Sequence, residues 1–291
     1  MASDFEAQVR ATNDRINART GRPLLRAILV GLTLGGAVLV SLLVVKELYM
    51  LFAGALVGFT TYELATALRA AGRDVPRIPT IVASLAVVPL TFTLGTGGLW
   101  LGFLGAVVVV SLWRLAELVS PVGRPPAREV WLDLGGGVFI LSYIALMGGF
   151  TVLLTAQEGG QFWTLAFLIV VVSVDTGAYA SGVAFGRHPM APTISPKKTW
   201  EGFAGSAAAA LLAAILLALL MLGQPWWVGA ILGLTMLATA TVGDLAESLI
   251  KRDLGIKDIS TWLPGHGGFL DRVDSSLLSG AAAYALFLIF A

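Results

Sequence analysis

The segment FAGSAAAALLAAILLALLML, residues 203–222, decides the fold of this chain. It carries no charged residue, and its length matches the ~20 apolar residues that a helix needs to cross a bilayer. Residues 27–45 and 270–291 approach or reach the same length. The whole chain is 57% hydrophobic with a mean hydropathy of +0.84, whereas soluble domains are roughly 45–50% apolar. The sequence therefore predicts an integral membrane protein.

Apolar segments separated by charged or turn residues recur along the chain and predict about nine transmembrane helices. Their approximate ranges are 27–45, 48–68, 79–95, 99–113, 130–154, 162–184, 203–222, 227–247 and 270–290. The tightest links lie at 46–47 and 95–98. With a cytoplasmic N-terminus, nine crossings place every Lys and Arg except Lys46 on the cytoplasmic side, in agreement with the positive-inside rule. We therefore expect an all-α polytopic membrane protein whose C-terminus lies on the opposite side.

This topology divides the chain into three parts. Residues 1–26 form a cytoplasmic N-terminal segment, 27–160 the N-terminal transmembrane helices, and 161–291 a C-terminal transmembrane catalytic region. The polar character of residues 1–26 argues against a cleavable signal peptide. Because no large extramembrane domain is visible, we expect the active site at the cytoplasmic ends of helices in the inner (cytoplasmic) membrane.

The composition argues against several classes of function. A net charge of +1 leaves no long basic face to follow a nucleic-acid backbone. The absence of cysteine removes disulfides, a thiolate nucleophile and cysteine-rich zinc sites. Two histidines are too few to favour a histidine-built metal site. We therefore expect membrane lipid, and no nucleic acid, among the partners.

Asp175, in the motif DTGAY at 175–179, is a lone carboxylate in the sixth apolar segment. A charged side chain at the bilayer centre costs about 2.5–3.5 kcal/mol on insertion scales. We therefore expect Asp175 to be paired, hydrated or bound to a metal. A structural ion pair or an interhelical hydrogen bond is the alternative to a functional role.

The motif SPKKTWEG at 195–202 leads into the seventh apolar segment. Its lysines and hydroxyl groups come just before a helix start, where exposed N–H groups also favour an anion. The polar side chains are Ser195, Lys197, Lys198, Thr199 and Glu201. The pattern is typical of a phosphate site, although a basic juxtamembrane loop with an ordinary helix cap would share it.

The densest group of charges runs from residue 244 to residue 274. Carboxylates and hydroxyls recur there at i, i+3 and i+4, a spacing that places them on one helical face. One face carries Asp244, Glu247 and Ser248, and the next helix carries Asp271, Asp274 and Ser275. Two such faces could hold magnesium (Mg2+) while substrate phosphates complete its coordination.

Between these two faces lies the glycine-rich sequence GHGG at 265–268. Glycine adopts backbone conformations closed to other residues and lets backbone amides approach an anion. The countercharges nearby in the sequence are Lys251, Arg252, Lys257 and Arg272. A network of internal salt bridges is the competing explanation for part of this group.

These residues indicate metal-assisted phosphoryl chemistry on a membrane-borne substrate, and they resemble the phosphatidate cytidylyltransferase family, also called CDP-diacylglycerol synthases. The family signature reads Ser, two residues, Lys-Arg, four residues, Lys-Asp, then Pro-x-His-Gly-Gly-x-x-Asp-Arg-x-Asp. Its fixed positions are met from Ser248 to Asp274. The DTGAY and SPKKTWEG motifs resemble further family elements. The resemblance covers about residues 170–276, whereas the first 160 residues match only in hydrophobic character.

The resemblance implies that CTP and phosphatidic acid react to give CDP-diacylglycerol and pyrophosphate. It implies Asp244 and Asp271 as the principal magnesium ligands, with Asp274, Glu247 and Asp175 as secondary candidates. The implied catalytic residues are Lys197, Lys198, Arg252, Asp271 and His266, where His266 binds a phosphate or orients a ligand rather than acting as the base. The implied substrate-binding residues are Ser195, Thr199, Glu201, Lys251, Lys257, Gly267, Gly268 and Arg272.

Three alternatives to this function remain at the level of sequence. A cytidylyltransferase for another lipid phosphate, such as an ether lipid, would carry the same charged motifs. An anion transporter would also place charges within helices, but near the midplane and often with inverted repeats. A catalytically inactive homologue is the third. The sequence leaves open whether a second, monovalent cation joins magnesium, and whether the small-residue runs at 202–210 and 280–283 pack within one chain or form a homodimer.

Overall fold

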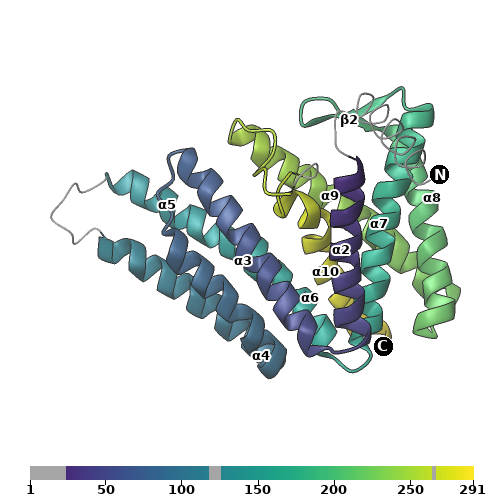
Figure 1. Ribbon diagram of the computed structural model, residues 1–291, viewed down its shortest axis with the longest axis horizontal. Helices are drawn as coiled ribbons and strands as arrows, with labels where there is room; N and C mark the ends of the chain where they lie inside the picture. The colour runs from purple at the N-terminus through teal and green to yellow at the C-terminus, as the bar shows by residue number, and fades with distance from the viewer. Residues whose placement is uncertain (1–23, 118–125, 264–266) are drawn as a thin grey trace, which may run out of the picture.

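The computed structural model describes residues 24–117, 126–263 and 267–291, and most of the secondary structure in these ranges is helical (Figure 1). The first half contains α2 (Leu24–Leu43), α3 (Glu47–Ala70), α4 (Arg77–Glu117), α5 (Ala127–Ile140), the π-helical turn η1 (Leu141–Leu146) and α6 (Met147–Ala156). The second half contains α7 (Gly160–Phe185), strands β1 (Pro189–Ala191) and β2 (Ser195–Thr199), α8 (Trp200–Leu217), η2 (Ala218–Leu222), α9 (Trp226–Asp253) and α10 (Leu270–Phe290).

Within the described ranges, seven helical segments are long and apolar enough to cross a membrane. They are Glu47–Ala70, Arg77–Glu117, Ala127–Ala156, Gly160–Phe185, Trp200–Leu222, Trp226–Asp253 and Leu270–Phe290. Large apolar side chains stand on their outer surfaces, including Leu220 at 82% exposure and Trp131 at 73%. Such a surface is unfavourable in water and suited to lipid. The prediction of a helical integral membrane protein is therefore confirmed.

Helix α4 reverses direction at Gly95, whose φ of 63° and ψ of −140° are not helical. A Cβ on Gly102 would lie only 3.1 Å from the Cα of Val87. In a straight helix, which rises 1.5 Å per residue, positions 87 and 102 would be separated by roughly 20 Å. The two arms of α4 therefore pack against each other, and their reversal falls within the tight link expected at 95–98.

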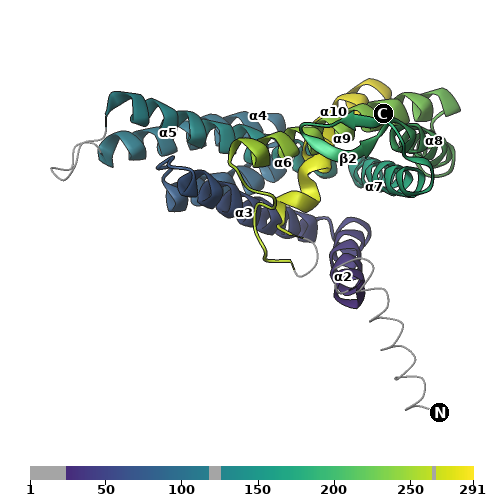
Figure 2. The ribbon, with the colours of Figure 1, turned by 90° about the horizontal axis from the view of Figure 1, so that it is seen from above.

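The helices form an elongated bundle in which α4 and α5 lie at one end and α7 and α8 at the other (Figure 2). Glycines allow close packing at the second end. A Cβ on Gly177 of α7 would lie 2.7 Å from the carbonyl oxygen of Gly205 on α8. A Cβ on Gly243 of α9 would likewise lie 2.6 Å from the Asp274 carbonyl on α10. These contacts bring the polar motifs of four helices within reach of one another.

One element in the described ranges was not expected from the sequence. Strands β1 and β2 form a short antiparallel hairpin in which Pro189 pairs with Thr199 and Ala191 with Ser195. The hairpin and the segment after α9 lie at the end of the bundle away from the C-terminus (Figure 1). The SPKKTWEG motif is therefore part of a strand followed directly by a helix, rather than an irregular loop.

Candidate active site

A polar cavity of about 490 Å³ lies between α7, α8, α9, α10 and the end of β2. All three motifs identified in the sequence contribute to its wall. The charged and hydroxyl-bearing side chains in this wall include Asp175, Lys197, Lys198, Thr199, Asp244, Glu247, Lys251, Asp258, Asp271, Arg272, Asp274 and Ser275. Residues almost one hundred positions apart in the sequence therefore meet around one space that a small anionic molecule could enter.

Lys198 at the end of β2 forms an ion pair with Asp244 of α9, with 2.5 Å between Nζ and Oδ2. The position of Lys198 depends on the next residue, Thr199, which is the N-cap of α8. The Thr199 hydroxyl accepts a hydrogen bond from the Gly202 amide at 3.1 Å, the usual arrangement at a helix start. The expectation that Thr199 lies at a helix start is confirmed, and the two lysines that precede this cap line the cavity.

Lys251 connects α9 to α10. Its ammonium group pairs with Glu247 on the same helix and with Asp271 on α10, 2.7 Å away. Glu247 and Asp271 are 1% and 5% exposed at the side chain, so their charges need a partner to be tolerated in the interior. The cluster of acids and bases at 244–274 is thus partly a salt-bridge network, which was the competing explanation in the sequence analysis.

The glycine sequence before α10 positions Asp271. The Gly268 amide donates a hydrogen bond to Asp271 Oδ2 at 2.7 Å. Gly267 adopts a φ of +80°, and a Cβ there would lie 2.8 Å from the same carboxylate oxygen. Glycine is therefore required at 267 both for its backbone conformation and for space. One turn later, Asp274 is 8% exposed and also lines the cavity.

Glu63 on α3 is a residue that the sequence analysis missed. It is 2% exposed and accepts three hydrogen bonds: from the Ser260 hydroxyl at 2.5 Å, the Phe269 amide at 3.0 Å and the Leu270 amide at 2.9 Å. A carboxylate at a helix N-terminus satisfies amides that have no partner within the helix. Glu63 therefore holds the start of α10 just before Asp271. A signal was available, since Glu63 is a lone acid in an apolar segment, as Asp175 is.

Several residues of the predicted site lie away from the cavity wall. Arg252 is exposed, and its Nε donates to the Ile194 carbonyl at 3.3 Å. Glu201 pairs with His188 Nδ1 at 2.5 Å. It also accepts hydrogen bonds from the backbone amides of Arg187 and His188, just before β1. Lys257 is exposed, and Ser195 is half-buried in β2. His266 lies outside the described residues, as do residues 1–23 of the N-terminal segment.

The five carboxylates expected to bind magnesium all line the polar cavity. They are Asp175, Asp244, Glu247, Asp271 and Asp274. Across the described ranges, no three acids or histidines are close enough together to hold a metal ion, and three of the five carboxylates pair with lysines instead. In the part of the chain that the structure describes, however, one of these five carboxylates has an oxygen, Glu247 Oε1, that is buried without a hydrogen-bond partner. Oxygen donors of this kind suit a hard cation, so the residues present fit magnesium.

A bundle of membrane helices that encloses lysines and carboxylates in one cavity has the properties of a membrane enzyme acting on phosphates. Comparison with known families agrees with this class. The sequence profile of the Cytidylyltransferase family matches residues 25–290, and the chain belongs to this family. The match includes the N-terminal helices, in which no motif was recognised from the sequence.

Curated relatives resemble the chain over most of its length. A phosphatidate cytidylyltransferase of Mycobacterium bovis is 41% identical over 272 residues, which cover 92% of this chain and 89% of that protein. The protein of the same name from Mycobacterium leprae is 38% identical over 276 residues, covering 92% and 88%. A third, from Brucella suis, is 38% identical over 214 residues, covering 72% and 73%.

Proposed function

We propose that the protein transfers the cytidylyl group of CTP to phosphatidic acid. An oxygen of the phosphatidate phosphate attacks the α-phosphorus of CTP, the bond from that phosphorus to the β-phosphate oxygen breaks, and CDP-diacylglycerol and pyrophosphate result. Family membership and the names of the relatives support this reaction. The observation that carries it in the molecule is the convergence of Lys197, Lys198, Lys251 and Arg272 on one cavity that also contains carboxylates.

The cavity is suited to bringing two anions together. The phosphatidate oxygen is anionic near neutral pH, so positioning and charge neutralisation matter more than a strong general base. Lys197 and Arg272 line the cavity and would neutralise substrate phosphates. Lys198 is already paired with Asp244, and a phosphate bound beside it would replace the carboxylate as its partner. Lys251 is held by Glu247 and Asp271 and would contribute a fixed positive charge.

Magnesium is part of this proposal. Asp244 and Asp271 would be its principal ligands, with Asp274, Glu247 and Asp175 as the other oxygen donors of the cavity. A bound divalent cation would neutralise phosphate oxygens and stabilise the pyrophosphate as it leaves. The replacement of Asp244 by phosphate at Lys198 would free a carboxylate for the ion, which links metal binding to nucleotide binding.

The direct test is pyrophosphate release by the purified protein in detergent. Phosphatidic acid is supplied with each of the four ribonucleoside triphosphates, with and without magnesium. We expect release with CTP only, and only when lipid and metal are both present. Release without lipid would indicate nucleotide hydrolysis, and activity restricted to an ether-linked lipid phosphate would change the substrate. Solute flux in proteoliposomes without nucleotide consumption would replace the enzyme by a transporter.

We also propose nine membrane crossings, a cytoplasmic N-terminus and an active site that faces the cytoplasm. This count adds α2 and the second arm of α4 to the seven spans. The chain has no cysteine, so single cysteines can report on each side. A membrane-impermeant thiol reagent should label Glu158→Cys in intact cells and leave Arg187→Cys unlabelled until the cells are opened. The reverse pattern would invert the topology.

A further inference from the structure

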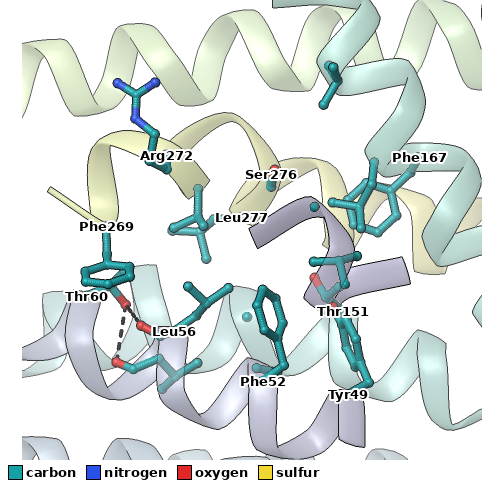
Figure 3. Close-up of a pocket in the computed structure, with 18 of the residues that line it drawn as sticks. Tyr49, Phe52, Leu56, Thr60, Thr151, Phe167, Phe269, Arg272, Ser276 and Leu277 are labelled. Carbon is teal, nitrogen blue, oxygen red and sulfur yellow. Dashed lines mark hydrogen bonds between the residues drawn. The ribbon is translucent and has the colours of Figure 1, made fainter. Parts of the chain in front are cut away.

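A second cavity, of about 580 Å³, lies beside the polar one and is almost entirely apolar. Its walls come from α2, α3, α6, α7 and α10 (Figure 3). Phe52 and Leu56 of α3 face Leu277 of α10 across it, and Phe167 of α7 closes one end. The Thr60 hydroxyl in the wall donates to the Leu56 carbonyl of its own helix at 2.7 Å, so it offers little to a polar ligand.

Arg272 is the residue that joins the two cavities, because it lines both. In Figure 3 its guanidinium points away from Leu277 and Phe52, so that its aliphatic stem borders the apolar space. Arginine commonly lays its stem along an apolar surface while the charged head lies elsewhere. Among the described residues, no carboxylate forms an ion pair with Arg272. A cation thus stands at one end of an apolar cavity, next to the proposed site of phosphate chemistry.

We propose that this apolar cavity holds one acyl chain of the lipid phosphate, with Arg272 binding the phosphate where the cavities meet. The inference rests on the proposed function and adds to it the position of the lipid. An anionic headgroup joined to a long apolar chain complements this arrangement in both charge and shape. A cavity of about 580 Å³ has room for a long acyl chain. The second chain would remain in the bilayer.

The physical role of such a cavity is orientation rather than affinity. A lipid tail in the bilayer is already in an apolar environment, so transfer into the protein yields little hydrophobic free energy. An ordered chain does, however, hold the phosphate in one position relative to the nucleotide, and positioning contributes strongly to rate. The proposal therefore predicts that filling the cavity changes the turnover of long-chain lipids more than that of short-chain lipids.

Two neighbouring glycines of α2 provide a matched pair of variants. Gly35 lines the cavity and Gly36 does not. At both positions an added Cβ meets no described atom within 4 Å, and both belong to the same helix. Gly35→Phe should therefore fill the cavity, whereas Gly36→Phe makes the same change of residue type on another side of α2. Any general effect on helix stability or membrane insertion is shared by the two variants.

The experiment compares kcat/KM for dipalmitoyl and dihexanoyl phosphatidic acid in mixed micelles. For Gly35→Phe we expect about a tenfold loss with the dipalmitoyl lipid, in the range typical of a filled apolar pocket, and less than about a twofold loss with the dihexanoyl lipid. Gly36→Phe should match the unmodified protein on both. Phe52→Ala, which enlarges the cavity, should shift the preference toward longer chains and serves as a second readout if Gly35→Phe is poorly folded.

The outcomes separate the two proposals. If the unmodified protein converts neither lipid, the proposed function itself fails. If it converts both, and the Gly35 and Gly36 variants show the same chain-length profile, the acyl-chain site is overturned while the function stands. An unchanged chain-length profile for Phe52→Ala would overturn the site as well, and would assign the cavity to another occupant, such as residues 1–23 or a second copy of the chain.

Discussion

The two halves of the chain both hold carboxylates within the helix bundle, but the partners of these carboxylates differ. In the C-terminal half, Asp244 and Asp271 pair with Lys198 and Lys251, and all four side chains line the polar cavity. In the N-terminal half, Glu63 accepts bonds from two backbone amides and a hydroxyl. Asp133 pairs with Arg114 at 2.7 Å and accepts the Asp74 amide, also at 2.7 Å.

The comparison shows that a buried charge in a membrane protein is not by itself a sign of catalysis. Each of these groups must have a partner, and the kind of partner distinguishes their roles. In the proposed mechanism Lys198, which lines a cavity, would exchange its carboxylate partner for a phosphate, whereas the backbone amides and the buried Arg114 hold their carboxylates within the helix bundle. We therefore expect substitutions in the two halves to change activity and stability in different proportions.

The largest effect is expected for Asp244→Asn. This change removes a proposed magnesium ligand and leaves Lys198 without its partner, so pyrophosphate release should fall by roughly 100-fold or more, as for loss of a major electrostatic contact. Asp253→Asn, at the exposed end of the same helix, is the matched control and should retain activity. Equal activity of the two variants would remove Asp244 from the site.

Glu63→Gln should have the next largest effect, although Glu63 lines neither the polar nor the apolar cavity. An amide group would face backbone N–H groups with its own N–H, and the start of α10 would move, displacing Asp271. We expect kcat to fall by about 10- to 100-fold, as for other residues that orient ligands. Activity per folded molecule is the measurement, and Ser260→Ala, which removes one of the three bonds, should give a smaller loss.

Asp133→Asn should lower stability much more than it lowers activity. Arg114 and Asp133 are 6% and 3% exposed, and removal of one member of a buried pair costs roughly 3 kcal/mol or more, here reduced by the remaining partner Glu117. The thermal midpoint in detergent should therefore fall while kcat changes by less than about twofold. A fall in kcat as large as that of Glu63→Gln would show that lost stability alone explains both variants.

The smallest effect is expected for Thr199→Ala. The change removes the N-cap of α8, which is worth about 1 kcal/mol in typical helices, and loosens Lys198 beside it. We expect a loss of activity of a few-fold with nearly normal stability. Thr199→Ser retains the capping hydroxyl and should restore activity, and failure of this rescue would point to a role for the methyl group instead.

Much of the candidate site could be predicted because the residues within each of its motifs are close together in sequence. The cap at Thr199 and the i, i+3 spacing of Asp244 and Glu247 are local properties, and a helix converts such spacing into a shared face. The resemblance to the family placed Arg252 in the catalytic set, but in the structure Arg252 lies outside the cavity wall and contacts the Ile194 carbonyl. A motif identifies a charged group without specifying which way its side chain faces.

By itself, the sequence determined that this protein lies in a membrane, where its apolar segments run, and which motifs are the candidates for its chemistry, because hydropathy and helical spacing depend only on neighbours along the chain. Only the tertiary structure decided that Glu63 supports Asp271 across some two hundred positions, that Lys251 pairs with both Glu247 and Asp271, and that an apolar cavity opens beside Arg272. Packing between distant helices determines such contacts, and no local pattern in the sequence encodes them.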